Sequence, residues 1–141
     1  MALPFYVIAA TQAGLSVQHV GLLLGAQTVG ALASNPVWGN IGDRHGKLTL
    51  LQRVGWLRVA TPVMAIGILA IGDAAGTTTL VAFIGLFILV GALSNGMTIG
   101  FLGFLMEISP DDQRPAYSAY FNALAAPAAL LPLLGAAIAD I

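Results

Sequence analysis

The chain has 141 residues, of which 8% are charged and 58% are hydrophobic, and its formal net charge is −1. A typical soluble protein has roughly 25% charged residues, and a net charge this close to zero gives no sign of a nucleic-acid partner. The sequence contains no cysteine, which excludes disulfides, thiolate metal sites and thiol nucleophiles.

The few charged residues are unevenly distributed. They fall in 43–58, at Asp73, in 107–114 and at Asp140, so that residues 74–106 carry none. A soluble domain of this size has too small a core to bury such a stretch, whereas roughly 20 apolar residues in a helix span a bilayer. Open sheets cannot lie in lipid, and the roughly 10-residue alternation of a barrel is missing. The pattern therefore predicts an all-α, polytopic integral membrane helix bundle.

Hydrophobic segments separated by short polar stretches predict about five transmembrane helices, over residues 2–13, 17–39, 48–72, 80–106 and 116–139. The first segment is too short to span the hydrocarbon, at roughly 18 Å of helix. Three prolines within the later segments, Pro62, Pro127 and Pro132, are expected to kink them. We expect one membrane domain over residues 1–141. The short first helix and the odd number of helices favour a piece of a longer polytopic protein over a complete small one.

Basic residues predict which loops face the cytoplasm. Arg44 and Lys47 lie in the predicted loop at 40–47, and Arg114 lies in the predicted loop at 107–115. The turns between the other segments carry no Lys or Arg. The positive-inside rule therefore places both charged loops on the cytoplasmic side of the plasma (inner) membrane, in a multi-pass arrangement.

The stretch GNIGDRHGK, residues 39–47, holds the first charges of the chain. A short cytoplasmic turn commonly contains Gly, Asp, Arg and Lys, so composition alone leaves it an ordinary connection. The order is more specific, because it resembles the signature loop of the major facilitator superfamily, G-x-x-x-D-R-x-G-R/K, which joins the second and third helices of a six-helix half. The positions that match are Gly39, Asp43, Arg44, Gly46 and Lys47, and Gly42 stands where the family often has Ala or Ser.

The resemblance extends beyond this signature. In the family, the helix two after the loop ends in a cytoplasmic loop with an acid, a proline and an arginine, which Glu107, Pro110 and Arg114 match here. The fifth segment resembles the fifth helix of a half, but Leu131 replaces the glycine of the Gly-Pro motif of drug antiporters, so that function is not carried over. Residues 3–16 resemble the seventh helix of the family more than its first, which favours the C-terminal half.

The resemblance implies part of a secondary active transporter that moves a small-molecule substrate across the bilayer by alternating access. Its partners would be the remaining helices of the transporter, and no cofactor is implied. Asp43 would accept bonds from cationic or helix-end donors, and Glu107 and Arg114 would join the same network to hold the cytoplasmic ends of helices together in one state. The alternative is a self-contained small membrane protein that acts as a homodimer or as a non-transporting partner subunit. No catalytic motif or metal-ligand spacing supports an enzyme.

Polar residues inside the predicted spans are candidates for a substrate path. Gln27 and Asn35 lie along the second segment and Asn95 along the fourth, where each either bonds a neighbouring helix or lines the path. Arg58 lies about ten positions into the third segment, roughly 15 Å by helical rise. It either snorkels to the surface or contacts an anionic substrate or a buried acid, for which Glu107 is the nearest candidate by depth.

Small residues recur at a spacing of four in the second and fourth segments. In lipid such faces let helices approach closely. We therefore predict helix packing at Gly21, Gly25, Ala26, Gly30, Ala92, Gly96 and Gly100.

Overall fold

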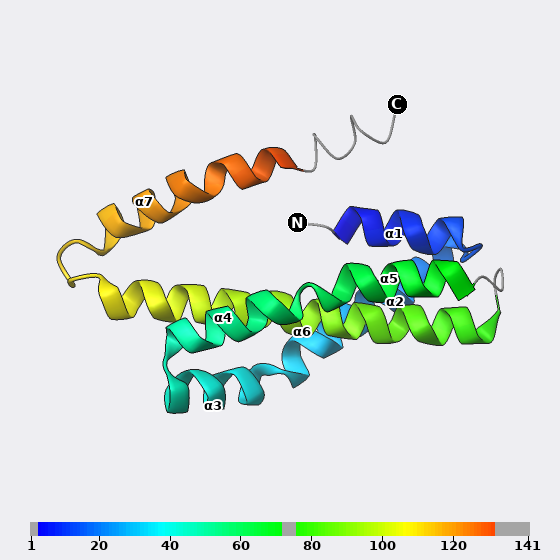
Figure 1. The fold of residues 1–141 in the computed structure, drawn as a ribbon, viewed down its shortest axis with the longest axis horizontal. Helices are drawn as coiled ribbons and strands as arrows, with labels where there is room; N and C mark the ends of the chain where they lie inside the picture. Colours follow the sequence, from blue (N-terminus) through cyan, green and yellow to red (C-terminus); the bar gives the residue numbers. More distant parts are fainter. Residues whose placement is uncertain (1–2, 72–75, 132–141) are drawn as a thin grey trace.

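The computed structural model describes residues 3–71 and 76–131. Within these ranges the chain is helical and contains no strand (Figure 1). The elements are α1 (Leu3–Gln12), α2 (Val17–Ala33), α3 (Asn35–His45), α4 (Lys47–Leu57), α5 (Ala60–Ile71), α6 (Thr77–Ile108), α7 (Arg114–Ala125) and the 3₁₀ helix η1 (Ala126–Leu130).

Helix α6 is the central element of the bundle. It runs the length of the molecule, with α4 and α5 following one another along it (Figure 1). Helix α2 packs along α6 as well, whereas α7 is joined to its end through the ring of Phe121, which lies edge-on to Phe101 at 5.2 Å between ring centroids. At 32 residues, α6 is about 48 Å long and exceeds the roughly 30 Å of hydrocarbon in a bilayer.

The all-α membrane class is confirmed. Three stretches of the described chain are long and apolar enough to cross a membrane, at Gln18–His45, Lys47–Ala70 and Thr77–Ile108. Helix α1 has 10 described residues and is not among these three stretches. The predicted fifth segment, 116–139, lies within the described residues only as far as residue 131, and there it forms α7 and then η1, which has Pro127 in its first turn. Pro132 lies outside the described residues.

The prediction of a loop at 40–47 is wrong. Helix α2 ends at Ala33, and α3 then continues through the expected loop to His45, so that Gly46 alone separates α3 from α4. Pro36 lies in the first turn of α3 and has no N–H to donate to the last turn of α2, which accounts for the interruption at Ser34. Gly46 has a φ of 82°, a left-handed conformation that glycine adopts without steric cost.

The predicted third segment, 48–72, is also interrupted, and its cause was correctly predicted to be Pro62. Proline lacks the N–H that would bond the carbonyl of Arg58 four residues earlier. The Thr61 N–H donates to that carbonyl instead at 3.2 Å, and the Thr61 hydroxyl donates to it at 2.9 Å. Helix α4 therefore ends at Leu57 and α5 begins at Ala60.

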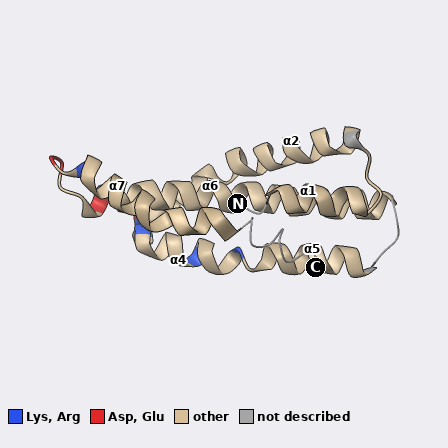
Figure 2. Ribbon diagram, turned by 90° about the horizontal axis from the view of Figure 1, so that it is seen from above, with Lys and Arg blue, Asp and Glu red and all other residues tan. Residues whose placement is uncertain are grey.

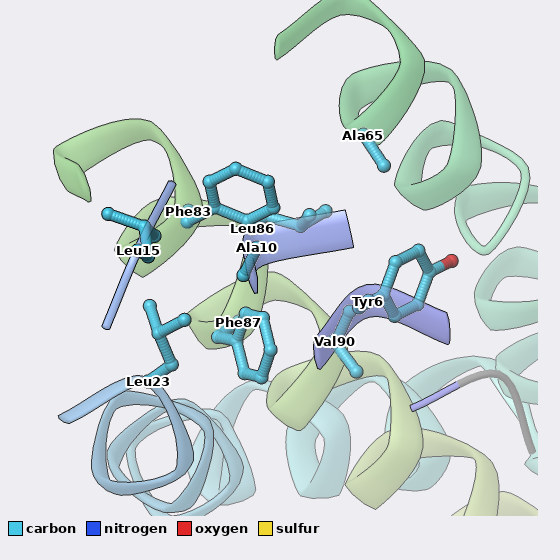
Figure 3. Close-up of a cluster of buried hydrophobic side chains, with 9 residues drawn as sticks. All are labelled: Tyr6, Ala10, Leu15, Leu23, Ala65, Phe83, Leu86, Phe87 and Val90. Carbon is cyan, nitrogen blue, oxygen red and sulfur yellow. The ribbon is translucent and has the colours of Figure 1, made fainter. Parts of the chain in front are cut away.

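Two apolar clusters hold the helices together. The larger one joins α1, α2, α5 and α6, and Figure 3 shows two residues of α1 against α6, with Ala10 near Phe87 and Tyr6 beside Val90. The smaller one joins α3, α4 and α6 through Trp38, Leu50, Val54 and Leu93. Because lipid tails are as apolar as these side chains, van der Waals packing supplies the attraction here.

The closest helix contact joins α2 and α6, where backbone meets backbone. A Cβ atom at Gly30 would overlap the backbone of Ile88, and one at Gly91 would overlap the carbonyl of Gln27. Packing by small residues was therefore correctly predicted at Gly30. At Gly21 and Gly25 the described chain makes no such contact, since a Cβ atom there would meet nothing within 4 Å.

Candidate functional site

The charged residues of the described chain lie in one half of the molecule (Figure 2), which contains the α3–α4 turn and the connection between α6 and α7. At the turn, the Lys47 ammonium lies 2.7 Å from the Asp43 carboxylate. The Asp43 side chain is 76% exposed and that of Lys47 is 25% exposed. A pair this exposed contributes about 1 kcal/mol or less to stability. The buried part of the Lys47 side chain is its alkyl stem.

The alkyl stem of Lys47 passes between two glycines on different helices. A Cβ atom at Gly42 of α3 would lie 3.2 Å from the Lys47 Cδ, and one at Gly103 of α6 would lie 3.0 Å from the same carbon. The lysine therefore brings three helices together, with its stem packed and its ammonium at the surface. Gly42, the position where this chain departs from the usual signature, is buried.

The other signature residues contribute less contact. A Cβ atom at Gly39 would meet nothing within 4 Å. Arg44 is exposed and forms no ion pair with any residue the structure describes.

The expected network of Asp43 with Glu107 and Arg114 is not formed in this conformation. Arg114 instead pairs with Asp111, at 2.6 Å, within the same connection. Glu107 is exposed and pairs with no base in the described ranges. Each formed pair is local, because an acid and a base stand three or four residues apart on one turn of chain.

A cavity of about 860 Å³ lies beside the break between α4 and α5. Arg58, Thr61 and Pro62 line it from the break, and Gln27 lines it from α2. Helices α1 and α6 supply the rest of the lining, which is Leu3, Tyr6, Val90, Leu93, Ser94, Met97, Thr98, Phe101 and Leu102. The expected pairing of Arg58 with Glu107 is absent, and Arg58 forms no ion pair within the described chain.

A chain of hydrogen bonds fixes the backbone where Arg58 enters the cavity. The Thr61 hydroxyl donates its one proton to the Arg58 carbonyl. The 2.9 Å bond between the hydroxyls of Tyr6 and Thr61 must therefore have Tyr6 as its donor. Helix α1 thus supplies, through Tyr6, a hydrogen-bond donor to Thr61 at the break beside Pro62.

Asn35 of α3 and Asn95 of α6 form a second polar contact between helices. The Asn95 amide donates to the Asn35 side-chain oxygen at 2.8 Å and to the Ala31 carbonyl at 2.9 Å. These bonds join the α2–α3 interruption to the middle of α6. A smaller cavity of about 380 Å³ beside Asn95 shares Gln27, Ser94 and Thr98 with the larger one.

The family model described as Major Facilitator Superfamily matches residues 1–141. The chain belongs to the major facilitator superfamily. Members of this superfamily are membrane transporters rather than enzymes, and the chain is accordingly an integral membrane protein. No curated protein and no solved structure gave a match.

Several residues of this superfamily member were not predicted as site residues. Tyr6 and Thr61 are 55 positions apart in the sequence. The one local signal was the position of Thr61 directly before Pro62, where a hydroxyl group can bond the backbone that proline leaves without a donor. Trp38 donates its indole N–H to the Ala92 carbonyl at 2.8 Å and lies against Gly96.

Metal ligation finds no support in the described part of this transporter sequence. No group of three or more His, Cys, Asp or Glu side chains there could hold a metal ion. His19 serves the start of α2 instead, since its Nδ1 lies 2.9 Å from the Ser16 hydroxyl.

Proposed function

We propose that this chain forms most of one half of a secondary active transporter, which moves a small solute across the plasma (inner) membrane by alternating access. The observation that carries the proposal is the cavity of about 860 Å³ within an apolar bundle, lined by hydroxyl, amide and guanidinium groups. Solute sites in such folds lie near the midplane, at helices whose regular structure is broken. The cavity meets the break at Pro62.

The remaining helices of the transporter are the proposed partners of this chain. Large apolar side chains stand exposed along its surface, among them Trp56 at 80% and Leu124 at 80%. Lipid can cover some of them, and further helices would cover the rest while completing the wall of the cavity.

The α3–α4 turn is the proposed cytoplasmic control point, with the 40–47 and 107–115 stretches both on that side. Lys47 ties α3 and α4 to α6, and the Asp43 carboxylate is exposed and can accept a second bond from a partner helix. Glu107 and Arg114 would join it when the cytoplasmic ends close. Exposed pairs of about 1 kcal/mol each can bias two states that differ by a few kcal/mol.

Access to Ser94 tests this proposal without knowledge of the solute. Ser94 is half-buried, lines both cavities, and would be the one cysteine of this chain after Ser94→Cys substitution. The protein as its gene encodes it, with any flanking helices, is placed in right-side-out and inverted vesicles and treated with a membrane-impermeant thiol reagent. Alternating access predicts reaction in both orientations.

The matched control is Asp112→Cys, at an exposed position of the α6–α7 connection, which should react in one orientation. Reaction of the Ser94 variant in that same single orientation, under every condition that preserves the fold, contradicts alternating access. Adding Asp43→Asn should change the ratio of the two Ser94 labelling rates, and an unchanged ratio removes Asp43 from the control point.

A further inference from the structure

We infer that the larger cavity takes an organic anion with an apolar body, recognised through the guanidinium of Arg58. This inference rests on the proposed function, because it names the class of solute for the same cavity.

The charge of the lining points to an anion. Arg58 is its one charged residue, and the polar groups around it are neutral, from Tyr6, Gln27, Thr61, Ser94 and Thr98. No acid of the described chain pairs with Arg58. A charge within a membrane span is costly and marks a functional contact by default. A guanidinium offers a planar fork of donors that matches a carboxylate with two parallel bonds.

The backbone around Arg58 is held in place, which is what a recognition group requires. The Arg58 carbonyl already accepts from Thr61, and Thr61 accepts from Tyr6. Tyr6 and Thr61 are both buried. Their hydrogen bonds serve the backbone of the break, so the guanidinium is left as the cationic donor group of the cavity.

The remaining wall defines the body of the solute. Leu93, Met97 and Phe101 of α6 present an aliphatic, a thioether and an aromatic side chain to the cavity. A volume of about 860 Å³ falls within the range of roughly 300–1,000 Å³ that holds small organic ligands. A small inorganic anion would leave this apolar wall uncovered, whereas a monocarboxylate with a hydrocarbon part satisfies both the wall and the single positive charge.

Equilibrium binding of benzoate and hexanoate, each against its own amide, tests the inference on the detergent-purified protein as its gene encodes it. The acids should bind more tightly than benzamide and hexanamide. Arg58→Gln should weaken acid binding by about 10- to 100-fold, the loss typical of a charge-assisted hydrogen bond, and leave amide binding unchanged. Arg58→Lys should lose less. Arg53→Gln is the matched control, since Arg53 is a cation of α4, five residues before Arg58 and exposed like it, but does not line the cavity.

Equal affinity for acid and amide, or acid binding that survives Arg58→Gln, overturns the inference. Amide binding shows that the Arg58→Gln variant is folded, and a variant that loses both ligands is replaced by Arg58→Lys, for which retained acid selectivity is required. An anionic lipid headgroup is the other source of a ligand for this guanidinium. If acid and amide bind equally in the absence of phosphatidylglycerol, and phosphatidylglycerol itself binds more weakly to Arg58→Gln than to the unaltered protein, the residue binds lipid and the inference is overturned.

The vesicle experiment on Ser94→Cys separates this inference from the proposed function. Reaction in both orientations without acid selectivity rejects the anion and leaves the transporter mechanism standing. Acid selectivity with one-sided reaction keeps the anion site and rejects alternating access.

Discussion

The stem of Lys47 lies across Gly103, in a space that a single methyl group on α6 would fill. The Lys47 Cδ would be 3.0 Å from a Cβ atom at that glycine. The signature lysine therefore has two separable parts, an apolar stem that packs between α3 and α6 and an ammonium that pairs with Asp43 at 2.7 Å.

Substitution of Lys47 separates the effects of these parts. Lys47→Met keeps an unbranched stem and should lower the free energy of unfolding by about 1 kcal/mol or less, because the lost ion pair is exposed. Lys47→Ala removes the stem as well and should cost about 1–3 kcal/mol more, by analogy with other large-to-small changes. Denaturation in mixed micelles, followed by the fluorescence of buried Trp38 in a Trp56→Phe background, measures both. Equal losses for the two variants would show that the stem contributes nothing.

How far the sequence predicts this arrangement depends on the range of the interaction. The residue order around Asp43 identified the family, and the uncharged stretches predicted membrane helices. The helical conformation of the signature residues in α3 was not predicted, because Gly, Asp and Lys in a charged stretch suggest a loop. In the structure a single residue with a left-handed conformation, Gly46, connects α3 to α4.

Contacts over long sequence separations were beyond local patterns. Tyr6 and Thr61 meet only because α1 is placed against the break in the third span. Gln27 and Arg58 were predicted separately as polar residues within spans, and the fold brings both to one cavity. Asn35 and Asn95 were predicted in the same way, and they bond each other across two helices.

The glycines of α2 and α6 differ sharply in the substitutions that they tolerate. Gly91→Ala and Gly30→Ala should each lower the free energy of unfolding by about 1–3 kcal/mol, since the added methyl group meets backbone that cannot rotate away. Gly25→Ala should be neutral or stabilising by up to about 1 kcal/mol, because the site is open and alanine favours a helix. Thermal unfolding in one detergent compares all three. Similar effects at Gly25 and Gly30 would contradict the close contact of α2 with α6.

The orientation of α6 predicts labelling on opposite sides of the membrane. Gly76 precedes the first residue of α6 and Asp112 follows its last, and 32 helical residues separate the two ends. Single cysteines at these positions should react with an impermeant reagent from opposite sides, Asp112 from the cytoplasm. Ser109 is a poor labelling position, because it is 6% exposed and its hydroxyl donates to the Leu105 carbonyl. Labelling of both cysteines from one side would refute the span.

The break at Pro62 predicts a measurable coupling between two substitutions. Thr61→Val removes the hydroxyl that donates to the Arg58 carbonyl and accepts from Tyr6. It should cost about 1–3 kcal/mol, because the buried Tyr6 hydroxyl loses its partner and the Arg58 carbonyl keeps only the Thr61 N–H. In a Pro62→Ala background the new N–H can bond the Arg58 carbonyl itself. The cost of Thr61→Val should then fall by at least about 0.5 kcal/mol, which a double-mutant cycle resolves.

Pro62→Ala alone should stabilise the third span, because proline disfavours a helix interior by about 3 kcal/mol relative to alanine. It should also make the span continuous and move Arg58 relative to the cavity, so that acid selectivity declines while the free energy of unfolding rises. Circular dichroism would report the added helix, and benzoate binding would report the cavity. Additive effects of Thr61→Val and Pro62→Ala, with unchanged benzoate affinity, would mean that the hydroxyl does not compensate for the proline and that the break does not position Arg58.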